Sequence, residues 1–317
     1  MTLPKLKQSL SRRRLLLEAS FFKFDCLWSK YYPFLCDGNI RNKHVFDSTE
    51  RLLTEEQWQN CYNPEGTIFW VKLGSYRNGN LNNLTGFVEH VLPKISHPFT
   101  LVTTDGDSSV PNDLSENVLH RLLENPNLVA WYTQNLADKR HPKLHSIPIG
   151  LDLHTDRGFG VGIKLQTTFR AMATQPAVPR LDRVLVDFAT SSNSNLRKSF
   201  IKANKDNCFV DILSARISQP ELWKMYRRYR WVVSLPGNGL DCHRTWEAGY
   251  LGANVLVADG VLQTLHNQKF ITQIDPHNRL KKSNLEGGGA CSFSNDEIVS
   301  DLYRRFIAPI KVSQCDE

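Results

Sequence analysis

The stretch Ser234–Gly260, SLPGNGLDCHRTWEAGYLGANVLVADG, has the order of an apolar strand, a glycine turn, a helix and a second apolar strand. Gly237, Asn238 and Gly239 permit a sharp turn, because glycine tolerates positive φ and lets a ligand approach the backbone. Asp241 is a suitable N-cap for the helix that follows. In parallel α/β sheets, ligands bind beyond the carboxyl ends of the strands, where the free N–H groups of the next helix attract anions. The stretch therefore predicts an anion-binding turn of the kind that usually holds a phosphate.

The helix behind this turn carries both signs of charge on one face. Arg244 and Glu247 are three residues apart and so share that face, and His243, four residues before Glu247, lies near it. A guanidinium can bind diphosphate oxygens in a bidentate way, and a carboxylate offers two acceptors to the hydroxyl groups of a ribose. An isolated Arg–Glu pair on a helix is usually a surface ion pair. Its position directly behind a glycine turn favours a nucleotide-sugar site instead.

Outward from this stretch, apolar runs of strand length alternate with segments of helical spacing. The predicted strands cover 67–74, 99–106, 128–135, 144–152, 183–190, 208–213, 231–237 and 254–259. Further helices are predicted at 113–125, 195–204, 219–229 and 295–307. Strands that alternate with helices predict an α/β fold whose parallel sheets are covered on both faces.

A polar, glycine-containing stretch at 155–179 interrupts this alternation and marks a domain boundary. A chain of 317 residues is long enough for two domains of ordinary size. We therefore predict an N-terminal α/β domain over 1–165 and a C-terminal α/β domain over 166–294. The final segment, 295–317, contains a helix able to pack back on the first domain.

Composition adds weaker constraints. A net charge of +7 suits an anionic partner such as a nucleotide or an acidic glycan. The basic clusters do not coincide with a recognisable nucleic-acid-binding motif, so no nucleic-acid partner is expected. The seven cysteines contain no C-x-x-C pair, so neither a zinc site nor a compact disulfide framework is indicated. No apolar stretch is long enough for a membrane span, and we expect a soluble chain with a cytoplasmic location favoured.

The run SLPGNGLDCHRTWEAGYLGANVLV resembles the nucleotide-sugar motif of exostosin-like glycosyltransferases, particularly the short algal and large-virus members. In that family a Ser-Pro-x-Gly turn leads to Arg, then Glu-Ala, then Leu-Gly and an apolar strand. The resemblance implies the GT-B architecture, in which two Rossmann-like domains face each other across a cleft and the second binds the donor. It implies that Glu247 holds the donor's ribose or sugar and that Arg244 lies near the diphosphate. Ala253, Asn254 and Val255 depart from the usual Cys or Ala followed by Ile-Pro.

The segment DFATSSNSNLRKSF, 187–200, is the second candidate for the phosphate site. It resembles the Ser-Asn loop and arginine that contact the donor diphosphate in fucosyltransferases of similar architecture. That resemblance implies that Ser192, Asn193 and Arg197 join the diphosphate site. From the residues alone the segment is equally a capped helix with Asn193 or Ser194 as N-cap.

An inverting transfer needs a base that deprotonates the acceptor hydroxyl. The candidates at the carboxyl ends of strands expected in the first domain are Asp105, Asp107, Asp152 and His154. Asp105 and Asp107 also form an Asp-x-Asp pattern, which in single-domain glycosyltransferases holds a divalent metal on the diphosphate. That alternative ranks second because it leaves the turn before Arg244 unexplained.

The sequence thus predicts a glycosyltransferase that takes a nucleotide sugar, with UDP favoured over GDP, and a glycan acceptor. No obligatory metal or other cofactor is predicted. The alternatives are a GDP-fucose-type enzyme, a metal-dependent Asp-x-Asp enzyme, and a non-catalytic binder of glycans or nucleic acid. Donor, acceptor and linkage are set by pocket contacts that short motifs do not encode.

Overall fold

The computed structural model describes residues 28–40, 54–74, 82–138, 141–260 and 269–285. The contacts within the chain define two compact units, and the second of these begins at Gly150. The sequence predicts this boundary between residues 165 and 166. By the contacts within the chain, the glycine-containing segment before residue 163 belongs to the second unit instead. The predicted segment 295–317 lies outside the described residues.

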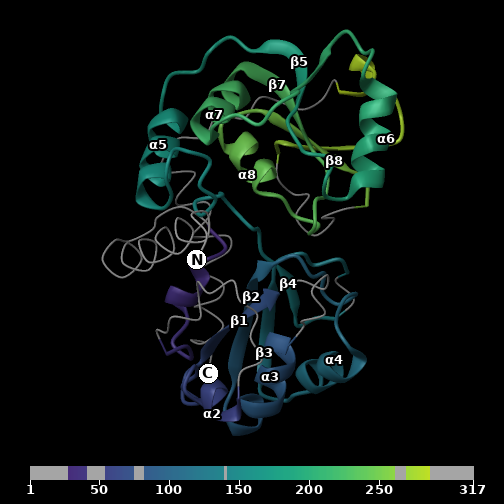
Figure 1. The fold of residues 1–317 in the computed structure, drawn as a ribbon. Coiled ribbons are helices and arrows are strands. Elements are labelled where there is room, and N and C mark those ends of the chain that lie inside the picture. Colours follow the sequence, from purple (N-terminus) through teal and green to yellow (C-terminus); the bar gives the residue numbers. More distant parts are fainter. Residues whose placement is uncertain (1–27, 41–53, 75–81, 139–140, 261–268, 286–317) are drawn as a thin grey trace, which may run out of the picture. The chain divides into compact units, whose positions relative to one another are not determined.

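The first unit contains a four-stranded parallel sheet in the order β1-β2-β3-β4 (Figure 1). Its strands are β1 (Ile68–Gly74), β2 (Phe99–Gly106), β3 (Leu128–Thr133) and β4 (Leu144–Ser146). Its helices are η1 (Tyr32–Leu35), α2 (Glu55–Gln59), α3 (Asn82–His90), η4 (Leu92–Lys94) and α4 (Glu116–Leu123). Strand β1 is almost continuously buried, as expected where a parallel sheet is covered on both faces.

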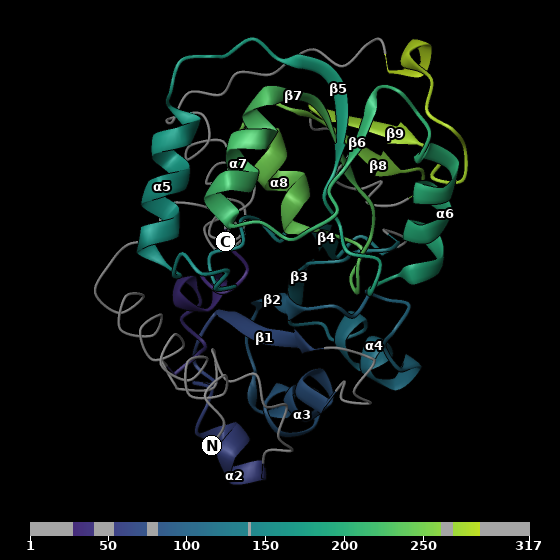
Figure 2. The ribbon, with the colours of Figure 1, turned by 45° about the horizontal axis from the view of Figure 1, so that its top comes forward.

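The second unit contains a five-stranded parallel sheet in the order β6-β5-β7-β8-β9 (Figure 2). Its strands are β5 (Leu181–Val186), β6 (Val210–Ile212), β7 (Tyr229–Ser234), β8 (Asn254–Ala258) and β9 (Ile271–Ile274). Its helices are α5 (Ile163–Ala173), α6 (Ser194–Asn204), α7 (Gln219–Arg228), α8 (His243–Tyr250) and η6 (Lys282–Asn284). The chain adds β6 on one side of β5 and then β7 on the other. The carboxyl ends of β5 and β7 therefore mark a topological switch point, where open α/β sheets bind ligands.

Helix α8 packs closely on the sheet of the second unit. Trp246 and Tyr250 are buried, and both rings contact the ring of Phe270. A Cβ on Gly249 would lie 2.3 to 2.7 Å from that same ring, so only glycine fits at this position. This packing fixes the helix that carries Arg244 and Glu247.

The predicted α/β fold with parallel sheets is confirmed. All eight predicted strands are present, and the predicted helices at 113–125, 195–204 and 219–229 appear as α4, α6 and α7. The sequence did not predict strand β9 or helices α2, α3 and α5. None of the helices in the described ranges combines the length and hydropathy needed to cross a membrane.

Candidate functional site

A polar cavity of about 290 Å³ lies at the carboxyl ends of β5 and β6 in the second unit. Its lining comes from several parts of this unit: the loop before α5, the segments after β5 and β6, helices α6 and α7, and the start of α8. Four arginines line it, Arg157, Arg197, Arg216 and Arg244, whereas Asp187 is its single carboxylate among the described residues. The lining also includes serines, and an excess of guanidinium groups over carboxylates favours an anionic ligand.

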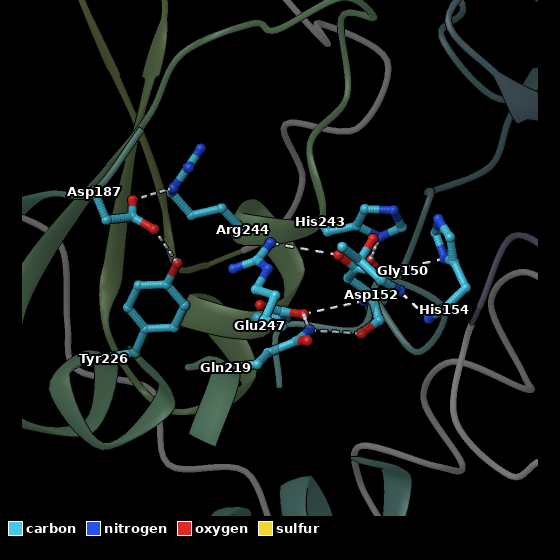
Figure 3. A network of polar contacts seen from close by, with 11 residues as sticks. Gly150, Asp152, His154, Asp187, Gln219, Tyr226, His243, Arg244 and Glu247 are labelled. Atoms are coloured by element: carbon cyan, nitrogen blue, oxygen red, sulfur yellow. Dashed lines mark hydrogen bonds and ion pairs between the residues drawn. The ribbon is translucent and has the colours of Figure 1, made fainter. Parts of the chain in front are cut away.

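Arg244 is held at this cavity by two residues of neighbouring elements. Its Nε donates to Oδ1 of Asp187, and the hydroxyl of Tyr226 donates to Oδ2 of the same carboxylate at 2.8 Å (Figure 3). Asp187 follows β5, and its side chain is only 4% exposed. Burial alone would lower the pKa of Arg244, but the charge of Asp187 outweighs it and raises that pKa above its usual range. Arg244 therefore stays charged, and its orientation is fixed through one nitrogen.

Arg197 is buried, and its guanidinium has a different environment from that of Arg244. Nε donates to the carbonyl of Pro236 at 3.0 Å, Nη2 to that of Leu235 at 3.0 Å, and Nη1 to that of Ala189 at 2.8 Å. Nη1 also donates to Oγ of Ser192 at 2.7 Å. These bonds tie the turn after β7 to the segment after β5. The predicted role of Arg197 and Ser192 as diphosphate ligands stays a prediction.

The glycine turn of the opening stretch is built by these contacts rather than by positive φ at Gly237. The amide of Gly237 donates to the carbonyl of Gly239 at 3.0 Å, and a Cβ on Gly237 would lie 3.0 Å from Nη2 of Arg197. The N-cap of α8 is Cys242, whereas Asp241 was the predicted cap. The carboxylate of Asp241 instead accepts from the indole of Trp246 at 2.9 and 3.0 Å.

The predicted Asn193 occupies the N-cap position of α6, in the left-handed region with φ of 45°, but its side chain makes no capping bond. Asn238 lies in the turn before α8, in the segment bounded by Gly237 and Gly239. Neither asparagine contributes a side chain to the cavity lining among the described residues.

Glu247 is buried, with 2% exposure, and lies outside the cavity lining. Its Oε1 accepts from the amide of Asp152 at 3.0 Å and from Nε2 of Gln219 at 3.1 Å, and Gln219 also donates to the carbonyl of Asp152 at 2.6 Å (Figure 3). His243 adds a 2.8 Å hydrogen bond between Nδ1 and the carbonyl of Gly150. Burial and the charge of Asp152 raise the pKa of Glu247. Helix α8 thus binds the backbone at the start of the second unit.

Asp152 is the centre of a compact polar cluster. Its Oδ1 accepts from the amide of Thr155 at 3.0 Å and lies 3.3 Å from Nδ1 of His154, while Nη2 of Arg157 lies 3.4 Å from Oδ2. Burial alone would raise the pKa of Asp152, but the charges of His154, His243 and Arg157 outweigh it and lower that pKa well below its usual range. Asp152 therefore stays ionised near neutral pH.

Asp152, His154 and His243 also offer donor atoms that lie within 4.8 Å of one another, a set that could hold a metal ion. One Asp and two His side chains are common ligands of Zn²⁺. Arg157 already balances the charge of the carboxylate, which disfavours a cation at the same place.

The other two predicted base candidates lie in the first unit, at the carboxyl end of β2. Asp105 has a positive φ of 60°, and its Oδ1 accepts from Nζ of Lys30 at 2.5 Å. Nζ of Lys72 lies 3.9 Å from its Oδ2. The amide of Asp107 donates to the carbonyl of Gly74 at 2.7 Å. The sequence expected all four candidates in one domain, whereas Asp152 and His154 belong to the second unit.

The structure thus brings Arg244, Arg197 and Ser192 to one cavity, and Glu247, His243, Asp152 and His154 to an adjoining hydrogen-bond network. Sequence reasoning did not single out Asp187, Tyr226, Arg157 or Arg216. Asp187 lies inside the strand predicted at 183–190, whereas β5 ends at Val186, so the sequence did not place this carboxylate at the carboxyl end of a strand.

Comparison with known proteins does not identify a family for this chain. No protein-family model and no curated protein matches the chain. The chain is similar to a solved structure described as "Crystal structure of GtfA/B complex", with a TM-score of 0.37 and 12% sequence identity over 73% of this chain. The match spans 55% of that protein's length. At this score the likeness identifies neither a family nor an activity, so the function is argued from the site.

Proposed function

We propose that this chain is an exostosin-like glycosyltransferase of GT-B architecture. It moves a sugar from a nucleoside diphosphate donor, with UDP favoured over GDP, to a hydroxyl of a glycan or glycoside with inversion. The observation that supports the proposal is the cavity beyond β5 and β6, at which Asp187 and Tyr226 hold the charged guanidinium of Arg244.

This cavity has the chemistry that a leaving diphosphate needs. Negative charge builds up on the phosphate as the glycosidic bond to it breaks, and fixed positive groups stabilise that charge. Arg244 uses only Nε for its bond to Asp187, and no other hydrogen bond of this guanidinium exists within the described residues. Its two terminal amino groups can therefore donate to a ligand as a fork. No metal is required for this charge balance, so we propose that none is obligatory.

Among the predicted bases, His154 is favoured. The lowered pKa of Asp152 makes this carboxylate a weak proton acceptor, and Asp105 is already ion-paired with Lys30. Nδ1 of His154 lies 3.3 Å from Asp152, an arrangement that orients an imidazole and stabilises its protonated form. Asp152 then acts as a positioning residue rather than as the base.

Titration calorimetry with UDP, GDP, UMP and uridine tests the donor site. We expect UDP or GDP to bind more tightly than the corresponding monophosphate and nucleoside. Arg244→Ala should weaken diphosphate binding by about 1.5 to 3 kcal/mol, the value of a hydrogen bond to a charged group. Arg228→Ala is the matched control, because Arg228 is exposed and lies outside the cavity lining. Equal affinity of the wild-type protein for UDP and uridine, and for GDP and guanosine, would remove the proposal.

A further inference from the structure

Arg157 lies on a loop that is closed on itself. The amide of Gly162 donates to the carbonyl of Leu153 at 2.7 Å, so the two ends of the loop meet. Within it, Oδ1 of Asp156 accepts from the amide of Gly158 at 2.9 Å. The loop therefore has a defined shape in the second unit, although its glycines are typical of a boundary between domains.

The guanidinium of Arg157 is only partly satisfied. Its Nη2 lies 3.4 Å from Oδ2 of Asp152, a long contact that fixes one end of the group. Its Nε is buried and has no hydrogen-bond partner within the described residues. A buried donor without an acceptor is unfavourable, and it belongs to a residue that lines the cavity. An oxygen of a ligand in this cavity would supply the acceptor.

Arg216 adds a third side chain of the same kind from a separate segment. It lies between β6 and α7, is exposed, and lines the cavity together with Arg157 and Arg244. It makes no hydrogen bond or ion pair within the described parts of the chain. Carboxylates balance Arg157 and Arg244, whereas none contacts Arg216, which leaves the lining with uncompensated positive charge.

We infer that Arg157 and Arg216 bind the phosphate groups of the ligand together with Arg244, so that the cavity selects a diphosphate over a monophosphate. This inference rests on the proposed function and names further residues that bind the diphosphate of the proposed donor. Three guanidinium groups from three segments of chain offer more donors than the oxygens of one phosphate can accept. Two linked phosphates offer more acceptor oxygens than one and can therefore satisfy more of these donors.

This inference is tested by measuring how well inorganic pyrophosphate and inorganic phosphate compete with bound UDP or GDP. Neither competitor contains a nucleobase, so the measurement reports on phosphate binding alone. The wild-type protein should bind pyrophosphate much more tightly than phosphate. In Arg157→Ala and Arg216→Ala, affinity for pyrophosphate should fall about tenfold or more, as expected for a lost charged hydrogen bond, and affinity for phosphate should fall less. A purely structural role would weaken both anions by the same factor. Arg228→Ala again serves as the control.

Arg157→Lys keeps the positive charge but loses the planar fork, so it should retain thermal stability and bind pyrophosphate with intermediate affinity. It replaces Arg157→Ala if the alanine variant unfolds. Wild-type preference for pyrophosphate that persists unchanged in the Arg157 and Arg216 variants would overturn the inference and leave the proposed function intact. A wild-type protein that binds neither a nucleoside diphosphate nor pyrophosphate would overturn both.

Discussion

Replacing Glu247 separates its structural role from the role in donor binding that the sequence suggests. Oε1 of Glu247 accepts two hydrogen bonds, from the amide of Asp152 and from Nε2 of Gln219. In Glu247→Ala the amide loses its acceptor, while Gln219 keeps its bond to the carbonyl of Asp152. An unsatisfied buried donor and a small cavity together should lower the free energy of unfolding by about 2 to 4 kcal/mol.

Glu247→Gln should behave differently, because the amide oxygen of glutamine can accept both hydrogen bonds. The substitution also removes the carboxyl group of Glu247, whose pKa is raised by burial and by the charge of Asp152. A carboxyl group with a raised folded pKa contributes its stability below its unfolded pKa, and this contribution is lost as pH rises through the folded pKa. The stability of the wild type relative to Glu247→Gln should therefore be highest in acid and decrease toward neutral pH.

Urea unfolding followed by tryptophan fluorescence measures both effects, since Trp223 and Trp246 are buried in this unit. Glu221→Gln is a suitable control, because Glu221 is exposed and glutamine preserves its capping role at α7. Equal destabilisation by Glu247→Ala and Glu247→Gln would refute the reasoning, as would a fully stable alanine variant. If Glu247→Gln stays folded but binds UDP or GDP less tightly, Glu247 also has a role in donor binding.

Two further predictions concern the transfer step and the metal. His154→Gln should abolish sugar transfer while UDP or GDP affinity, measured by calorimetry, stays within about twofold of wild type, because the proposed base does not bind the diphosphate; unchanged transfer would exclude His154. Nucleoside diphosphate binding and transfer should survive EDTA and the Asp105→Asn substitution, whereas loss with EDTA and recovery with Mn²⁺ or Mg²⁺ would favour a metal-dependent site, either at Asp105 and Asp107 or at Asp152, His154 and His243.

The strands were predictable because a parallel sheet covered on both faces needs continuous apolar runs, and those runs are visible in the sequence. Strand β9 (Ile271–Ile274) was missed because it is short and its central residues are polar, Thr272 being partly buried and Gln273 exposed. Helix α5 (Ile163–Ala173) was missed because it follows a glycine-rich loop that resembled a linker. In both places tertiary packing, rather than local pattern, decides the structure.

The candidate site was predictable only in part. Arg244 could be found because it stands directly behind a glycine turn. Its partner Asp187 is 57 residues away, and the two meet only because β5 and β7 pair side by side. Arg157 could not be found from local pattern, since a single arginine in a polar loop carries no periodic signal. Which side chains meet at such a site depends on the order of the strands, so these residues can be identified only when the topology is known.

Arg197 and Arg244 show why a motif does not decide the role of an arginine. Both line the same cavity, yet Arg197 uses all three of its nitrogens to bind carbonyls and a hydroxyl, whereas Arg244 uses one nitrogen to bind a carboxylate. A phosphate that approached Arg197 would compete with backbone acceptors that shape the turn. A phosphate that approached Arg244 would meet two free amino groups on a guanidinium already held in place. Arg244 is already oriented in the folded protein, so it loses little side-chain entropy when a ligand binds. It is therefore the better diphosphate ligand of the two.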